Sequence, residues 1–229
     1  MSVRIVLSVM MLSITACGAA RMAVPADVAQ ASEELPITDR SSWSGALADE
    51  SFRLGPYKVT DVDRKWDSTH SNSLFGVDRS KTTGGYSFKL GGKDVELAGE
   101  CATEDREKSR DLGGGFEFSS MSAKLGCTCH DASASANVVL AASTTDTYEG
   151  TLNSGSNEYH VAAINERDGG GSSHDPTGYR VDGGEAPLGA VDVMGTGRVW
   201  LNRTVEGRVR DDLACIFAGL LLYKPPKDR

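Results

Sequence analysis

The 229-residue sequence lacks the motifs of common hydrolases and, after its N-terminus, any run of 18 apolar residues. It has no G-x-S-x-G, the turn that carries the nucleophile of many serine hydrolases, and no H-E-x-x-H, the metal-binding motif of zinc proteases. Positive charge is also scarce. With 24 Lys+Arg against 32 Asp+Glu, the formal net charge is −8, which argues against nucleic acid as a partner because phosphate binding needs a basic face. We therefore expect no cofactor, and favour a binding or structural module over an enzyme.

The N-terminal segment has the order of a secretory signal. Arg4 follows the free amine, and Ile5 to Ile14 form an apolar run interrupted by serines. Such a run is too short to cross a bilayer, which needs about 20 residues, but it has the length of a signal-peptide core.

The four residues Ile14-Thr15-Ala16-Cys17 then place a branched apolar residue and two small residues before a cysteine. This pattern resembles the lipobox of bacterial lipoproteins. The resemblance implies cleavage after residue 16, a lipidated Cys17 that anchors the chain to a membrane, and a location in the bacterial cell envelope. Gly18, in place of an aspartate, favours the outer membrane, facing the periplasm or the cell surface.

Composition divides the remaining chain into two parts. Residues 17–50 are rich in Ala, Ser, Pro and acidic residues, which is typical of a lipid anchor followed by a flexible tether. Residues 51–229 are expected to form a single β-rich domain. Glycine is also abundant, because 26 of the 229 residues are glycine, a share of about 11% against a usual share of about 7%. This abundance favours a fold with many turns.

Short alternating segments recur along residues 51–201 with glycine or polar clusters between them. Alternation with period two predicts strands with one buried face, and spacings near ten residues predict an antiparallel sandwich or barrel. Gly84-Gly85, Gly91-Gly92 and Gly183-Gly184 are expected at hairpin turns. The expected strands begin at residues 52, 57, 86, 95, 116, 121, 138, 147, 159, 178, 189 and 197.

The C-terminal segment differs from these strands. Asp211 and Asp212 precede a wholly apolar stretch from Leu213, and Pro225-Pro226 follow it. This predicts one buried helix over about 210–223. A series of strands closed by an apolar C-terminal helix resembles, in outline, the tubby-like barrel shared with the scramblase and LURP-one families, which implies that the helix fills a barrel.

Five cysteines make an odd count, and assigning Cys17 to the lipid leaves four. An oxidising compartment then favours two disulfides among Cys101, Cys127, Cys129 and Cys215. A bond between Cys127 and Cys129 would close a very tight ring. We therefore expect one of these two to pair with Cys101 and the other with Cys215, and the sequence leaves open which.

Two other patterns suggest chemistry. Cys127, Cys129 and His130 offer zinc ligands, although C-x-C is tighter than the usual C-x₂₋₄-C spacing. The glycine-rich loop 168–176 contains His174 next to Asp175. If the protein were a hydrolase or a metal-dependent enzyme, these two residues would be the candidate active-site residues. That loop lacks the lysine and helix of a phosphate-binding loop, so we expect a mobile hairpin loop. The mixed-sign stretch 104–111 is expected to be a solvated loop or short helix.

The expected function is therefore that of a membrane-anchored envelope lipoprotein with a non-enzymatic binding or structural role. Its expected partners are the membrane, through the lipid on Cys17, and a small-molecule, lipid or protein ligand.

Overall fold

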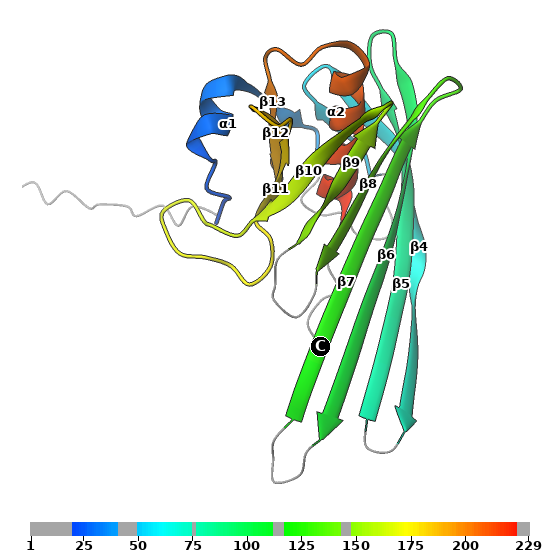
Figure 1. Ribbon diagram of the computed structural model, residues 1–229. Coiled ribbons are helices and arrows are strands. Elements are labelled where there is room, and N and C mark those ends of the chain that lie inside the picture. Colours follow the sequence, from blue (N-terminus) through cyan, green and yellow to red (C-terminus); the bar gives the residue numbers. More distant parts are fainter. Residues whose placement is uncertain (1–19, 41–49, 75–76, 112–116, 143–147, 224–229) are drawn as a thin grey trace, which may run out of the picture.

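The computed structural model describes residues 20–40, 50–74, 77–111, 117–142 and 148–223, which form an antiparallel, barrel-like sheet around one helix (Figure 1). The two helices are α1 (Ala26–Ala31) and α2 (Gly207–Leu222). The strands, in chain order, are β1 (Ser32–Leu35), β2 (Ile37–Thr38), β3 (Phe52–Leu54), β4 (Tyr57–Leu74), β5 (Val77–Gly91), β6 (Glu96–Asp111), β7 (Glu117–His130), β8 (Ser135–Ala142), β9 (Glu149–Ser154), β10 (Asn157–Ile164), β11 (Gly178–Asp182), β12 (Pro187–Asp192) and β13 (Arg198–Asn202).

The sheet is a meander whose two edges are joined by the chain itself. Strands β3 to β13 pair with their sequence neighbours, β1 pairs with β13, and β2 pairs with β3. Because Pro36 alone separates β1 from β2, these two strands act as one extended segment that bridges the ends of the sheet. Proline suits this position since it has no N–H to donate, while its carbonyl accepts a hydrogen bond from Gly55 N at 2.8 Å.

Helix α2 fills the interior of this barrel. Every residue from Asp212 to Leu222 is buried, and the main hydrophobic cluster joins the helix to inward side chains from β1 and from each of β3 to β13. A helix that is apolar all round needs such an enclosure. The expected mainly β fold with one buried C-terminal helix is therefore confirmed. The helix starts earlier than expected, so Asp211 and Asp212 lie in its second turn.

Strand alternation is regular around the barrel. In β5, Tyr86, Phe88 and Leu90 are buried against α2, whereas Lys89 between them is exposed. The expected turns at Gly91-Gly92 and Gly183-Gly184 are present, but Gly84-Gly85 lies within β5. A Cβ at Gly85 would approach the carbonyl oxygen of Cys101 to 2.9 Å, so a close strand contact, and not a turn, requires glycine there.

Four strands are far longer than the rest. β4, β5, β6 and β7 have 18, 15, 16 and 14 residues and project beyond the barrel as a four-stranded sheet (Figure 1). We call this projection the arm and define it as residues 65–74, 77–85, 103–111 and 117–124. The expectation of a loop or short helix over 104–111 is wrong, because this stretch is part of β6.

The N-terminal part of the described chain belongs to the barrel. Residues 17–50 are expected to be a tether, yet within this range α1, β1 and β2 are folded onto the domain. Helix α1 packs outside β12 and β13, and Met22, Val28, Ile164, Ala190 and Trp200 form a second hydrophobic cluster there. Sequence composition misses this segment because its apolar residues are few and widely spaced. None of the helices in the described ranges is long and apolar enough to span a bilayer.

Candidate functional site

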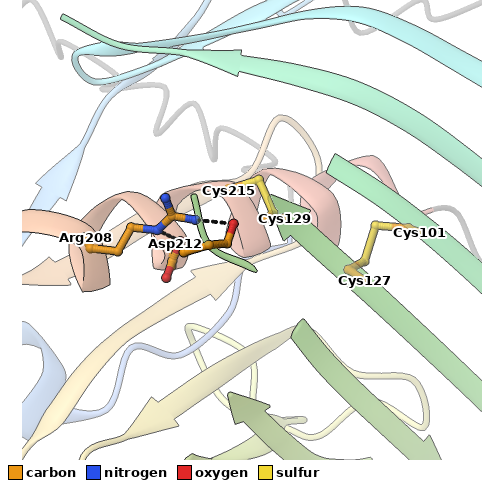
Figure 2. The surroundings of a disulfide bond; sticks show 7 residues. Cys101, Cys127, Cys129, Arg208, Asp212 and Cys215 are labelled. Carbon is orange, nitrogen blue, oxygen red and sulfur yellow. Dashed lines mark hydrogen bonds and ion pairs between the residues drawn. A yellow bond between two sulfur atoms is a disulfide. The ribbon is translucent and has the colours of Figure 1, made fainter. Parts of the chain in front are cut away.

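Two disulfides cross-link the fold, one between the helix and the barrel wall and one between two strands of the wall (Figure 2). Cys129 of β7 is bonded to Cys215 of α2, and Cys101 of β6 to Cys127 of β7. The expectation that Cys127 and Cys129 divide between Cys101 and Cys215 is confirmed. The register decides which pairs with which: Cys101 and Cys127 are directly opposite each other in the β6–β7 ladder, with Cα atoms 4.1 Å apart.

Gly219 allows the helix to pass over the disulfide between β6 and β7. A Cβ on Gly219 would lie 3.0 Å from Cys101 Sγ and 3.2 Å from Cys127 Sγ. Gly219 follows Cys215 by one helical turn, so the two residues share a helix face. That face of α2 therefore contacts sulfur at two successive turns, once by a covalent bond and once by close packing.

The zinc interpretation of Cys127, Cys129 and His130 does not fit this arrangement. Zinc binds thiolates, whereas both sulfurs are in disulfides. Across the described part of the chain, no group of three or more His, Cys, Asp or Glu residues is placed to hold a metal ion.

An ion network lies at the N-terminal end of α2 (Figure 2). Arg208 Nε contacts Asp212 Oδ1 at 2.7 Å, one turn along the helix, and Arg208 also binds Asp131 after β7. Ser154 Oγ donates to the other oxygen of the buried Asp212 at 2.6 Å. Burial opposes the charge on Arg208, but the two carboxylates outweigh it and raise the pKa of Arg208. This network compensates the charge of Asp212, which lies inside the barrel.

Asp131 also organises the β7–β8 hairpin. Its Oδ1 accepts hydrogen bonds from the hydroxyl and backbone N–H of Ser133, both at 2.7 Å, and from Ala134 N at 3.0 Å. These donors, together with Arg208, hold the pKa of Asp131 well below its usual range. The side chain therefore ties the turn to the helix.

Barrel side chains cap the C-terminal end of α2. The last carbonyls of a helix have no partner within it. Here Arg40 donates to Leu221 O at 2.6 Å, Arg64 to Leu222 O at 3.0 Å, and the Tyr86 hydroxyl to Gly219 O at 2.8 Å. Two guanidinium groups at this end also complement the helix dipole. Burial raises the pKa of Tyr86 and lowers that of Arg40.

His174 and Asp175 lie on the loop between β10 and β11, and both are exposed. The loop is closed by backbone hydrogen bonds, from Arg167 N to Gly171 O at 3.0 Å and from Ser173 N to Asn165 O at 2.8 Å. Gly169, Gly170 and Gly171 all have positive φ. The structure thus places the two residues on an exposed loop of the barrel. Burial is the main cause of the raised pKa of Tyr179 and of Tyr223, and the charge of Asp175 adds to it. Cys17 lies outside the described residues.

The arm sorts charge by face. Residues opposite one another in an antiparallel pair share a face, as do residues two apart on a strand. One face continues the barrel interior from Tyr86 and Cys101. On the other, which we call the outer face, Lys81 is opposite Arg106 and Glu104 is opposite Lys124. Lys81 and Arg106, with side chains 44% and 61% exposed, both contact Glu104.

The backbone register extends this pattern toward the tip of the arm. Arg79 is opposite Lys108, and Val77 is opposite Arg110, at outer-face positions. The inner-face positions of the same two strands include Asp78, Asp105 and Glu107 and, within the described strands, no basic residue. By backbone register, a stretch that is mixed in linear sequence therefore has mostly basic residues at positions of one face and acidic residues at positions of the other.

Sequence reasoning missed this surface, although the signal is present. From Glu104 to Asp111 the charges are arranged so that even-numbered positions carry Glu, Arg, Lys and Arg, and odd-numbered positions carry Asp, Glu, Ser and Asp. Charges that alternate with period two, as hydrophobic residues do in a strand with one buried face, predict a strand with oppositely charged faces.

Comparison of the chain with protein-family models, curated proteins and solved structures gave no match.

Proposed function

We propose that the protein is a lipid-anchored lipoprotein of the bacterial cell envelope with a non-enzymatic role. In this proposal the barrel is a rigid scaffold that presents the arm to a partner with a negatively charged surface. The observation that carries the proposal is the helix inside the barrel. Because α2 occupies the interior that a small ligand would need, binding is assigned to the outside of the molecule.

The arm is the external surface best suited to docking. It is a four-stranded sheet whose described outer side chains include the exposed Arg106 and Lys124, in a chain of net charge −8. A basic face on an acidic protein attracts an anionic partner while the remaining surface repels it, so the charge pattern also orients the encounter.

The lipid anchor rests on the Ile14-Thr15-Ala16-Cys17 pattern and is tested separately. We expect wild-type protein to incorporate labelled palmitate and to fractionate with membranes, and Cys17→Ser to do neither. Normal palmitate labelling of Cys17→Ser would refute the lipobox interpretation.

The docking face is tested with heparin as a defined polyanion, immobilised on a column. We compare Arg106→Gln/Lys124→Gln with Lys58→Gln/Lys93→Gln, which removes the same charge from exposed positions on the barrel. Basic side chains at an anionic surface contribute about 1 kcal/mol each, so we expect the arm variant to bind about tenfold or more weakly and the barrel variant to bind like wild type. Equal weakening by both pairs would show a net-charge effect and would refute a specific face.

A further inference from the structure

The chain joins the barrel only a few residues after the proposed lipid site. Met22 forms an antiparallel bridge with Arg167, Asp168 N donates to Arg21 O at 2.8 Å, and Ala23 N donates to Glu166 O at 2.9 Å. Residues 21–23 therefore run beside the start of the β10–β11 loop, which comprises residues 165–177. This loop lies next to the N-terminal end of the described chain.

Met22 is fixed in place by packing and by polar contacts. Its side chain is fully buried over Gly178, where an added Cβ would meet the methionine sulfur at 2.1 Å. Its backbone N–H donates to buried Asp192 at 3.4 Å, and its carbonyl accepts from Arg198 at 3.2 Å. Arg198 and Asp192 are themselves paired at 3.0 Å. The point at which the chain leaves the barrel is thus a rigid part of the fold.

The remaining linker is short. Four residue steps separate Cys17 from Arg21, and an extended chain spans at most about 3.6 Å per residue. The Cα atom of Cys17, the residue that carries the lipid, therefore lies within about 14 Å of the Cα atom of Arg21 in any conformation of the linker.

We propose that the β10–β11 loop faces the bilayer that holds the Cys17 lipid, and that the arm lies on the far side of the barrel. This orientation rests on the proposed lipid anchor. The loop contains Asn165, charged residues, glycines and serines but no large apolar side chain, so it lies at the level of the headgroups and does not enter the hydrocarbon.

The strand order places the arm on the wall of the barrel opposite this loop, although both leave the same end of the barrel, where Asp105 of the arm and Asp175 of the loop both act on Tyr223. Going round the closed sheet, with β1 and β2 counted as one segment, five strands lie between β11 and β5 in either direction. Figure 1 shows the loop and the arm on different sides of the barrel. The outer face of the arm points away from the barrel axis on the wall opposite the loop, so a bilayer that lies along the loop's wall leaves this face accessible to a partner.

The orientation is tested on the full lipidated protein, purified from membranes and reconstituted in phosphatidylcholine vesicles. With four cysteines in disulfides and Cys17 lipidated, an introduced cysteine is a unique thiol for a fluorophore. We compare Ser172→Cys in the loop with two exposed controls, His70→Cys on the arm and Ser156→Cys in the β9–β10 turn. The quencher is a nitroxide attached to lipid headgroups.

We expect strong quenching at residue 172 and little at residues 70 and 156. A second variant, with ten Gly/Ser residues inserted after Ala19, should still float with the vesicles but lose most of the quenching at residue 172. Equal quenching at the three sites, or none at residue 172, in protein that floats with the vesicles would overturn the orientation and leave the anchor standing. Failure to float would overturn the anchor, and the orientation with it.

Discussion

The guanidinium group of Arg64 donates a hydrogen bond of 3.0 Å to the carbonyl oxygen of Leu222, the last residue of α2. The same group binds Glu50 at 2.8 Å and lies over the ring of Tyr86, 5.5 Å from its centroid. One side chain thus joins β4, β5, the segment before β3 and the end of the buried helix. Together with Arg40 and Tyr86, it donates hydrogen bonds to the last carbonyls of α2, which water does not reach inside the barrel.

Replacing Arg64 with Met is expected to destabilise the fold by about 1–3 kcal/mol, because it leaves a helix carbonyl and Glu50 without their charged donor. Arg53→Met is the matched control, since Arg53 is exposed and its contact to Asp39 is 3.7 Å long. Urea unfolding monitored by circular dichroism measures both. Equal effects in the two variants would argue against a capping role for Arg64.

Enlarging Gly219 is expected to separate α2 from the Cys101–Cys127 disulfide. The Cβ of Gly219→Val would meet both sulfurs within 3.2 Å, and overpacking of this kind costs about 1–3 kcal/mol. Helix propensity works in the opposite direction, because valine is a better helix former than glycine. Ala218→Gly, at the neighbouring buried position, is the comparison, since it removes a buried methyl group and lowers helix propensity by about 1 kcal/mol. Thermal unfolding without reductant measures both, and an unchanged or raised midpoint for Gly219→Val would contradict the packing.

The two disulfides are expected to differ in their contribution to stability. Cys129–Cys215 closes a separation of 86 residues and links the helix to the wall, whereas Cys101–Cys127 closes 26 residues between strands that are already hydrogen-bonded. Chain-entropy estimates give about 3–5 kcal/mol for loops of this range, more for the longer one. We therefore expect Cys129→Ala/Cys215→Ala to have a lower denaturation midpoint than Cys101→Ala/Cys127→Ala. The reverse order would show that the strand staple is the more important.

Asp131 is expected to make stability depend on pH in acid. Hydrogen bonds hold its folded-state pKa below the unfolded value of about 3.9. Its contribution is therefore complete above about pH 5. It declines as the pH passes the unfolded-state pKa and is lost as the pH falls through the lower, folded-state pKa. The difference in unfolding free energy between wild type and Asp131→Asn should be constant from pH 7 to about 5 and shrink below about 4. Asp94→Asn, at an exposed turn, is the control, and a difference that stays constant to pH 2 would contradict the prediction.

Local patterns predicted most of the barrel wall. Segments such as Tyr86 to Leu90 alternate because one face packs on α2, and the apolar stretch from Leu213 is helical because it is enclosed on every side. Hydrophobic alternation does not predict the strands of the arm, because the arm sequences do not alternate in hydrophobicity. It fails again at Met22 to Thr38, where single residues are buried by distant strands.

The candidate site was predicted only in part, because its contacts join segments that are far apart in sequence. The four cysteines were identified as two bridges, but the pairing required the β6–β7 register. Arg208 and Asp212 are visible as an i,i+4 pair, whereas Asp131 and Ser154 reach them only in the folded barrel.

The sequence by itself determined the class of fold, the buried C-terminal helix and the presence of two disulfides, because each of these follows from residue type and short-range periodicity. The tertiary structure decided the rest: which cysteines pair, how Pro36 links the two edges of the sheet, and that 104–111 is a strand whose charges are divided between two faces. These features depend on register, and register is set by the packing of the whole barrel around α2, where a shift of one residue would exchange every buried side chain for an exposed one.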